Sequence, residues 1–202
     1  VEVSLGKRKI RLALQTELPW DEMTTIQVET EEPTEFEIAL RLPGWCEQYT
    51  LWINAEEQAA EWRDGYLYLR RCWQTGDRVQ IRLAMPVVVV QANPRVREDI
   101  GKAALMRGPI VYCLEEADNG KDLHRIRMRA DVEYQIEHCP DLLQGVTRIR
   151  AQGEILLPWE EDSLYAGSYT ARYEAKELTW IPYYAWANRE TGEMRVFARV
   201  RP

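Results

Sequence analysis

A glycine–lysine pair at Gly101-Lys102 is the first place where residue types and spacing could do chemistry. A phosphate-binding loop needs G-x-x-x-x-G-K-[ST], because its glycines let backbone N–H groups close on phosphate and its hydroxyl holds Mg²⁺. Here Val96 stands where the first glycine is required, and Ala103 follows the lysine. The pair therefore fails as a phosphate loop at both ends, and residues 97–119 instead predict a strand, a turn and a second strand.

The two histidines, His124 and His138, are the next candidates, since histidine is the usual general base near neutral pH. His138 stands beside Cys139, but adjacent side chains in an extended chain point apart, so the two do not form a catalytic dyad. His124 lies in a polar segment without a nucleophile motif, which favours a surface role. The motifs G-x-S-x-G, H-E-x-x-H and the EF-hand loop are absent from the sequence.

Cysteines and carboxylates give no stronger signal. The cysteines are widely spaced, without the C-x-x-C spacing of metal ligands, so each is predicted to be a small buried hydrophobe, although an even count leaves two disulfides open; they are Cys46, Cys72, Cys113 and Cys139. With 33 acidic residues, acidic clusters are expected by chance, and a solvated face is the favoured interpretation. These clusters are Glu98-Asp99, Glu115-Glu116 with Asp118, and Glu160-Glu161-Asp162. We therefore predict no catalytic residue and no metal ligand in this chain.

Aromatic residues are the remaining lead, because eight Trp and ten Tyr in an acidic chain could stack against sugars. The candidate carbohydrate contacts are the tryptophans at turns or loop edges: Trp20, Trp45, Trp62 and Trp159. The alternative is that most of these rings close domain edges and inter-domain contacts, which the general burial of tryptophan favours.

The elements that must position these residues are strands. Apolar residues recur at every second position in 10–14, 26–28, 36–42 and 79–83, which places one face of each strand in a core. Turn signals such as Asp64-Gly65 and Gly76-Asp77 separate them. No amphipathic helix longer than two turns is predicted. The fold class predicted is all-β, with two β-sandwich domains of jelly-roll or immunoglobulin-like type.

Composition changes near residue 100, which predicts a domain boundary there. We expect one sandwich over 1–102, completed by a returning strand in 193–202, and a second over 103–192. The net charge of −7 and pI near 5.1 argue against a nucleic-acid partner, and no apolar run is long enough for a membrane helix. A cytoplasmic location is expected.

Four stretches together carry a resemblance to a known family: "LRLPGWCEQYTLWIN", "GYLYLRRCWQTGDRVQIRLAMPV", "DIGKAALMRGPIVYCLE" and "IPYYAWANRETGEMRV". As a set they resemble the C-terminal part of glycoside hydrolase family 127, which contains β-L-arabinofuranosidases. The resemblance implies that a catalytic (α/α)₆ barrel precedes this region in the parent protein, with a zinc site made by a Glu and three Cys. This sequence lacks the Glu-x-Cys motif and the Cys-Cys pair of that site, so the catalytic residues do not carry over.

The resemblance implies a non-catalytic accessory region of such a hydrolase, inactive on its own and without a cofactor. Its expected partner is the catalytic barrel of the parent chain, with a homodimer contact as a further expectation. The alternative is a carbohydrate-binding module for plant glycans that contain arabinose.

Overall fold

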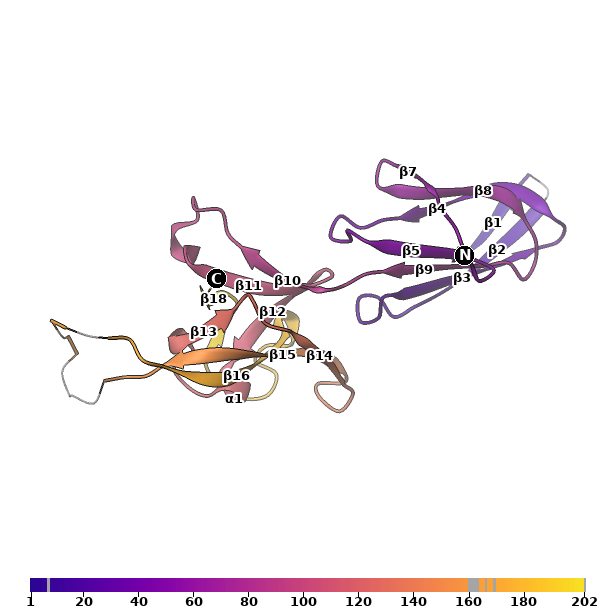
Figure 1. The fold of residues 1–202 in the computed structure, drawn as a ribbon. Helices are drawn as coiled ribbons and strands as arrows, with labels where there is room; N and C mark the ends of the chain where they lie inside the picture. Colours follow the sequence, from indigo (N-terminus) through magenta and orange to yellow (C-terminus); the bar gives the residue numbers. More distant parts are fainter. Residues whose placement is uncertain (7, 160–163, 166, 169, 202) are drawn as a thin grey trace. The chain divides into compact units, whose positions relative to one another are not determined.

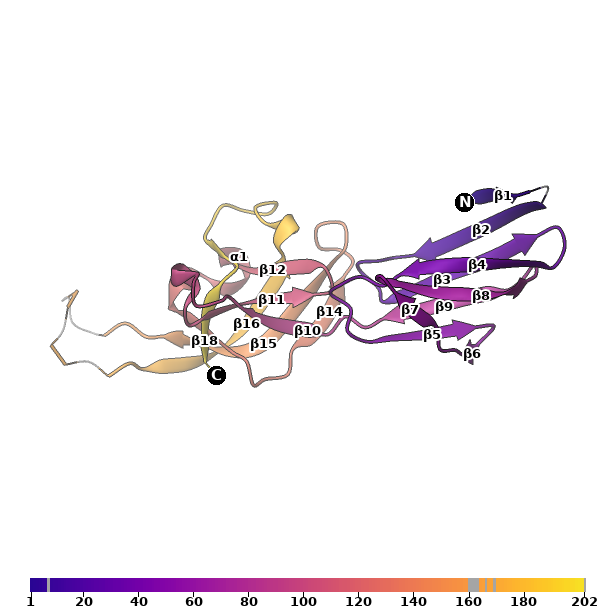
Figure 2. The same ribbon diagram turned by 90° about the horizontal axis from the view of Figure 1, so that it is seen from above.

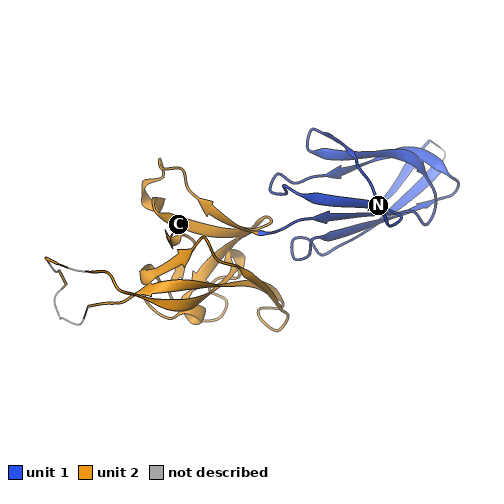
Figure 3. Ribbon diagram, in the orientation of Figure 1, with its two compact units in different colours: residues 1–86 blue, residues 87–202 orange. Residues whose placement is uncertain are grey.

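The computed structural model describes residues 1–201 except 7, 160–163, 166 and 169. The chain divides into two compact units, Val1–Pro86 and Val87–Pro202 (Figure 3). Both are built almost entirely from strands, as the sequence predicted, and the described α-helix is a single turn, α1 (Glu116–Asn119). Among the described residues, no helix has the length and apolar character needed to cross a membrane.

Unit 1 consists of two sheets (Figure 1). The larger sheet has the order β1-β2-β3-β9-β5-β6, and the smaller has the order β4-β8-β7. The strands are β1 (Glu2–Leu5), β2 (Arg8–Thr16), β3 (Met23–Thr30), β4 (Thr34–Arg41), β5 (Tyr49–Ile53), β6 (Glu56–Glu57), β7 (Glu61–Arg63), β8 (Tyr66–Trp73) and β9 (Arg78–Leu83). All the pairings in both sheets are antiparallel.

The core of unit 1 lies between these two sheets. Val28, Leu51 and Val79 of the larger sheet pack in one cluster with Leu67 and Trp73 of the smaller sheet. The alternation of apolar and polar residues along β3 and β4 explains this, because every second side chain points to the same face of a strand. Trp73 is fully buried, and its indole Nε1 donates a 3.0 Å hydrogen bond to the carbonyl oxygen of Phe36.

The hairpin turns of unit 1 form where the sequence places glycine or a residue that tolerates positive φ. Asp64 and Gly65, between β7 and β8, have φ of 51° and 82°. Asp77, before β9, is buried, and its carboxylate accepts hydrogen bonds from Asn54 Nδ2 at 2.8 Å and from the backbone N–H of Gln74 at 2.9 Å. These contacts join the β5–β6 and β8–β9 turns at one end of the unit.

Unit 2 is a single sheet in which six of the described strands close into a ring, in the order β11-β18-β13-β15-β16-β12 and back to β11. The strands β10, β14 and β17 pair at its margin. The bounds are β10 (Val87–Gln91), β11 (Lys102–Arg107), β12 (Ile110–Glu115), β13 (Ile126–Arg129), β14 (Gln135–Cys139), β15 (Val146–Leu156), β16 (Tyr173–Pro182), β17 (Met194–Arg195) and β18 (Ala198–Arg201). The 3₁₀ turns in the described part of this unit are η1 (Arg97–Asp99), η2 (Leu123–Arg125) and η3 (Tyr183–Ala185).

Every strand of the ring contributes to one core. Leu105, Leu114, Met128, Ile149 and Leu178 are fully buried in it. Because a closed ring leaves no second layer to pack against, the core fills the interior of the ring itself. The prediction of a second sandwich was therefore wrong for this unit, where one closed sheet replaces two facing sheets.

The boundary and the last strand also differ from the sequence-based expectation. The division falls at residue 86/87, not at 102, because β10 pairs with β11 over Val87↔Arg107 to Gln91↔Ala103 and so belongs to unit 2. The chain end does not return to the first unit: β18 pairs with β11 and, in parallel, with β13. Residues 97–119 thus lie wholly inside unit 2.

The predicted strand, turn and strand in that segment are confirmed as β11, the Gly108-Pro109 turn and β12. Gly101 and Gly108 both have positive φ, 74° and 54°, which glycine adopts more readily than residues with a Cβ. The Nζ atom of Lys102 lies 3.9 Å from Asp99 Oδ1. The two glycines therefore permit the backbone conformation of this segment, and the Lys102 side chain lies near an acidic side chain.

Candidate functional site

The four tryptophans predicted to contact carbohydrate lie on separate elements of the fold. Trp20 lies in the loop between β2 and β3 and is 42% exposed, and Trp62 lies on β7, in the other sheet, and is 62% exposed. Trp45 is half-buried and packs against the core of unit 1. Trp159 is half-buried in unit 2, beyond β15. The rings thus come from separate elements of two sheets and from both units.

A pair of exposed rings does lie together in unit 2, on η3 after β16. The rings of Tyr183 and Trp186 are stacked, with centroids 6.2 Å apart and an angle of 10° between their planes. Both are more than 40% exposed. Trp186 is the last residue of the "IPYYAW" segment, but the sequence analysis did not select it as a contact residue. The sequence feature that could have identified Trp186 is the concentration of aromatic residues after Pro182, in a segment that follows a buried strand.

The most buried group of charges in the described residues is formed by Glu115, Asp118 and Arg189. Arg189 Nη1 donates a 2.9 Å hydrogen bond to Asp118 Oδ1, and its Nη2 donates to carboxylate oxygens of both acidic residues. The side chains of Glu115, Asp118 and Arg189 are 6%, 12% and 18% exposed. Hydrogen bonds from the guanidinium to Asp118, and then to Glu115, raise the pKa of Arg189.

This group fixes two loops to each other. Glu115 Oε1 also accepts a hydrogen bond from the backbone N–H of Ala187 at 2.9 Å. Asn119, at the end of α1, donates from Nδ2 to the carbonyl oxygen of Thr179 at 2.8 Å and accepts from the Thr179 N–H at 3.0 Å. Both oxygens of each carboxylate therefore have a protein donor, which suits a structural role better than proton transfer.

The sequence missed this group because Glu115 and Asp118 were assigned to a solvated face. The available signal was that Glu115 directly follows the continuous apolar run 110–114, which predicts a buried strand and so a buried end. Arg189 lies more than 70 residues away in sequence, and no local pattern connects it to the acidic pair. The acidic stretch Glu160-Glu161-Asp162 lies outside the described residues.

A second group of side chains, Asp122, His124 and Glu193, has the geometry to hold a metal ion. One ligand atom from each lies within 4.8 Å of the others, and two of the three residues are exposed. Both carboxylates already have donors, however: Glu193 Oε2 accepts from the Leu123 N–H at 2.8 Å, and Asp122 Oδ2 accepts from Arg125 Nη1 at 3.2 Å. The positive charge of Arg125 disfavours a cation here.

All four cysteines are free thiols. Cys46 and Cys113 are buried, as the sequence predicted, whereas Cys72 is exposed and Cys139 is half-buried, so the prediction was wrong for these two. Burial raises the pKa of the Cys113 thiol to about 12, and it also raises the pKa of Cys46. A nucleophilic or zinc-binding cysteine needs a lowered pKa, since the thiolate is the reactive form. The pKa values of the Cys46 and Cys113 thiols are raised instead, so neither thiol meets this requirement.

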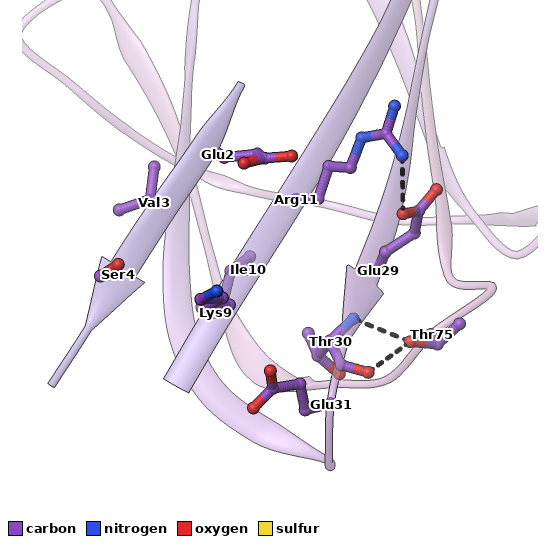
Figure 4. A pocket seen from close by; sticks show the side chains of 10 residues that line it. All are labelled: Glu2, Val3, Ser4, Lys9, Ile10, Arg11, Glu29, Thr30, Glu31 and Thr75. Carbon is purple, nitrogen blue, oxygen red and sulfur yellow. Dashed lines mark hydrogen bonds and ion pairs between the residues drawn. The ribbon is translucent and has the colours of Figure 1, made fainter. Parts of the chain in front are cut away.

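One open hollow of about 660 Å³ lies on unit 1 at the end of the β1-β2-β3 sheet (Figure 4). Charged residues dominate its rim, and Arg11 Nη1 lies 3.4 Å from Glu29 Oε2. Thr75 Oγ1 donates to the carbonyl oxygen of Thr30 at 2.6 Å and accepts from its N–H at 2.7 Å, which closes the hollow on one side. No aromatic ring lines it, so it lacks the stacking surface that a sugar-binding groove uses.

The division of the chain into two units agrees with comparisons to protein families. Residues 1–85 match a family model described as "Beta-L-arabinofuranosidase, GH127 middle domain", and residues 87–199 match "Glycoside hydrolase family 127 C-terminal domain". The chain belongs to glycoside hydrolase family 127. The resemblance found in the sequence is thereby confirmed.

Known relatives point to the same family. The chain is 38% identical to a non-reducing end β-L-arabinofuranosidase of Bifidobacterium longum subsp. longum, over 92% of this chain and 30% of the relative. It matches the crystal structure of a GH127 β-L-arabinofuranosidase from Geobacillus stearothermophilus T6 with a TM-score of 0.94 and 38% identity, over 100% of this chain and 32% of that one.

A second solved structure, a GH127 β-arabinofuranosidase, matches with a TM-score of 0.85 and 31% identity, over 99% of this chain and 33% of that one. The chain thus spans about a third of the length of these relatives.

Proposed function

We propose that this chain is a non-catalytic accessory region of a family 127 glycoside hydrolase, which packs against the catalytic part of a longer protein. The parent is a β-L-arabinofuranosidase, in line with the activities named for its relatives. In this proposal unit 1, with its two sheets, is a β-sandwich scaffold. Unit 2, with its closed ring of strands, follows it in the sequence. A homodimer contact through the same region is part of the proposal.

The main support for this proposal comes from the surroundings of the carboxylates and the thiol that could act in catalysis. The buried Glu115 and the half-buried Asp118 share one ion-pair partner, Arg189, and the buried thiol of Cys113 has a raised pKa. Glycoside hydrolysis needs two carboxylates that face a sugar across a cleft. Here the two acids face one guanidinium instead, and Glu115 Oε1 also accepts from the backbone N–H of Ala187.

The direct test is an activity assay of the purified 202-residue chain on aryl β-L-arabinofuranosides, with and without added zinc. We expect no turnover above a buffer blank in either condition. Turnover well above the blank, abolished by Glu115→Gln or Cys113→Ser, would show that the chain contains an active site. Circular dichroism of each variant is the control that loss of activity is not loss of fold.

A second candidate function, carbohydrate binding, is favoured by one observation: the exposed, parallel rings of Tyr183 and Trp186. Calorimetric titration with arabinose-containing oligosaccharides tests it. The accessory proposal predicts no saturable heat up to millimolar sugar. Binding that is lost in Trp186→Ala, Trp20→Ala or Trp159→Ala but retained in Trp73→Phe would favour the binding module.

A further inference from the structure

One apolar face of unit 1 extends beyond the sheet that covers the rest of it. In β2, Leu12 pairs with Val28 and Leu14 pairs with Ile26, and both partners in β3 are core residues. Directly paired residues of antiparallel strands project to the same face of the sheet. The apolar side chains of β2 therefore continue the inner, core-forming face of the larger sheet toward its edge.

Strand β1 prolongs the same face by one more strand. Val3 pairs with Ile10 of β2 and Leu5 pairs with Arg8. Backbone hydrogen bonds of 2.8 Å set Val1 opposite Leu12. We call the resulting set the inner-face patch; it consists of Val1, Val3, Leu5, Leu12 and Leu14.

Much of the patch is exposed because the core cluster of unit 1 does not extend across β1 and the far end of β2. The core cluster of unit 1 includes side chains of β3, β5 and β9 opposite those of β4 and β8, and from β2 the half-buried Leu12. Ile10 of β2 is also buried, at 3% exposed, but it lies outside that cluster, and no described residue of β1 belongs to it. Figure 2 shows β4, β8 and β7 alongside β3, β9 and β5, with β1 and β2 beyond them. Accordingly, Val3, Leu5 and Leu14 are 43%, 45% and 59% exposed.

The opposite face of the same strands is charged, which shows that the two faces serve different environments. Glu2 pairs with Arg11, and Arg11 pairs with Glu29, so a row of alternating charge crosses β1, β2 and β3 (Figure 4). A strand with polar residues on one face and apolar residues on the other is the pattern of a sheet that is covered on its apolar side. The inner-face patch therefore has the pattern of a buried surface.

The family comparisons indicate what covers it. The family model matched from residue 1 describes a middle domain, so another part of the chain precedes this domain in family members. In such a protein the preceding chain runs directly into β1, the strand that carries Val3 and Leu5. A covalently linked neighbour is present at a high effective concentration, which favours it over a separate partner.

We propose that the inner-face patch is the surface through which the middle domain docks on the preceding, catalytic region of the parent enzyme. This inference rests on the proposed function and adds the surface to it. In this proposal an apolar surface of the catalytic region covers the inner-face patch. It thereby forms the second layer over β1 and β2.

The test compares two neighbouring lysine substitutions in two backgrounds, the 202-residue chain and the complete enzyme. Leu14→Lys places a charge in the patch, whereas Gln15→Lys, on the next residue and the charged face, is the matched control. Scanning calorimetry measures Tm, and sedimentation measures the oligomeric state. We expect both variants of the chain alone to stay within about 2 °C of the unmodified chain, because both positions are exposed.

In the complete enzyme we expect Leu14→Lys to lower Tm by about 4 °C or more, with Gln15→Lys unchanged. Equal Tm values for the two variants of the complete enzyme would overturn the assignment. It would also be overturned if the chain alone were a dimer that Leu14→Lys converts to a monomer, since a second copy would then cover the patch. The non-catalytic role in the proposed function is tested separately, since it fails if the chain alone hydrolyses the aryl arabinofuranoside.

Discussion

The apolar face of the β-sheet is covered in different ways in unit 1 and unit 2. In unit 2 the sheet closes on itself, and every ring strand turns apolar side chains into one interior. In unit 1 a three-stranded sheet faces a six-stranded one, and on the inner face of β1 and β2 the side chains of Val3, Leu5 and Leu14 remain exposed, although Ile10 is buried. A closed sheet needs no neighbour, whereas a sheet wider than its cover does. The comparison is therefore the basis for proposing that unit 1, and not the closed ring of unit 2, carries the docking surface.

The largest effect is expected at the buried charges that hold the loops of unit 2. Arg189→Ala leaves Glu115 and Asp118 buried without their cation, which destabilises by about 3–5 kcal/mol. Urea unfolding of the variant, followed by far-UV circular dichroism, measures the loss. Arg70→Ala is the control, because the Arg70–Glu35 pair is largely exposed, and less than about 1 kcal/mol is expected. A similar loss in both variants would contradict the structural role of the group.

A matched pair of leucine truncations sharpens the contrast inside unit 1. Leu67→Ala, in the covered core, is expected to cost about 2–5 kcal/mol through lost burial and a cavity. Leu14→Ala, in the inner-face patch, is expected to cost less than about 0.5 kcal/mol in the chain alone. Both values come from urea unfolding at one pH. If Leu14→Ala costs as much as Leu67→Ala, the patch is already covered and the comparison fails.

The tight fit of the ring in unit 2 is tested at Gly153 of β15. A Cβ at this position would overlap the side chain of Leu178, which is fully buried, and would lie 3.0 Å from the carbonyl oxygen of Arg127. Gly153→Ala is therefore expected to destabilise by about 1–3 kcal/mol. Gly44→Ala, where an added Cβ meets nothing within 4 Å, is the control. A neutral Gly153→Ala would mean that the ring is less closely packed than the structure indicates.

The smallest effect concerns the pH dependence that Glu154 gives to unit 2. Hydrogen bonds from Arg127, and then from Arg201, lower the pKa of this carboxyl below its usual value. A carboxyl with a lowered folded-state pKa contributes stability that is present above its unfolded pKa, about 4.3, and is lost as pH falls through the folded value.

Glu154→Gln should accordingly cost about 1 kcal/mol at pH 7, and this difference from the unmodified chain should vanish in acid below the folded pKa. Unfolding in urea at pH 7, 5 and 3 tests it, with Glu35→Gln as an exposed control. A difference that stays constant with pH would show that the ion pairs of Glu154 do not contribute in this way.

Much of the local structure could be predicted because it depends on neighbouring residues. The alternation in β2, β3 and β4 identified the inner faces, and Gly108-Pro109 identified the turn of the β11–β12 hairpin. The closure of the ring could not be predicted. It depends on β18 pairing with β11 and β13, and the sequence separation between these strands leaves no local pattern.

The domain boundary was misplaced for a related reason. The run Val87 to Val90 continues the apolar character of the strand before it, so its assignment to unit 2 depends on its pairing with β11. The buried Glu115–Arg189 pair was missed because acidic residues are usually solvated, and only the fold brings a distant arginine to them. The alternation of apolar and polar residues identifies the side chains that make up the inner-face patch. Their exposure, however, depends on the width of the opposing sheet, which the sequence does not show.

Hydrogen–deuterium exchange tests the central claim most directly, because it reports on β1–β2 and on the ring in one experiment. The 202-residue chain and the complete enzyme are compared by peptide-resolved mass spectrometry. The account predicts that peptides of β1 and β2 exchange at least about tenfold more slowly in the complete enzyme, since a docked surface suppresses local opening, while β15 and β16 exchange equally in both. Equal exchange at β1 and β2, or slowing confined to β15 and β16, would contradict it.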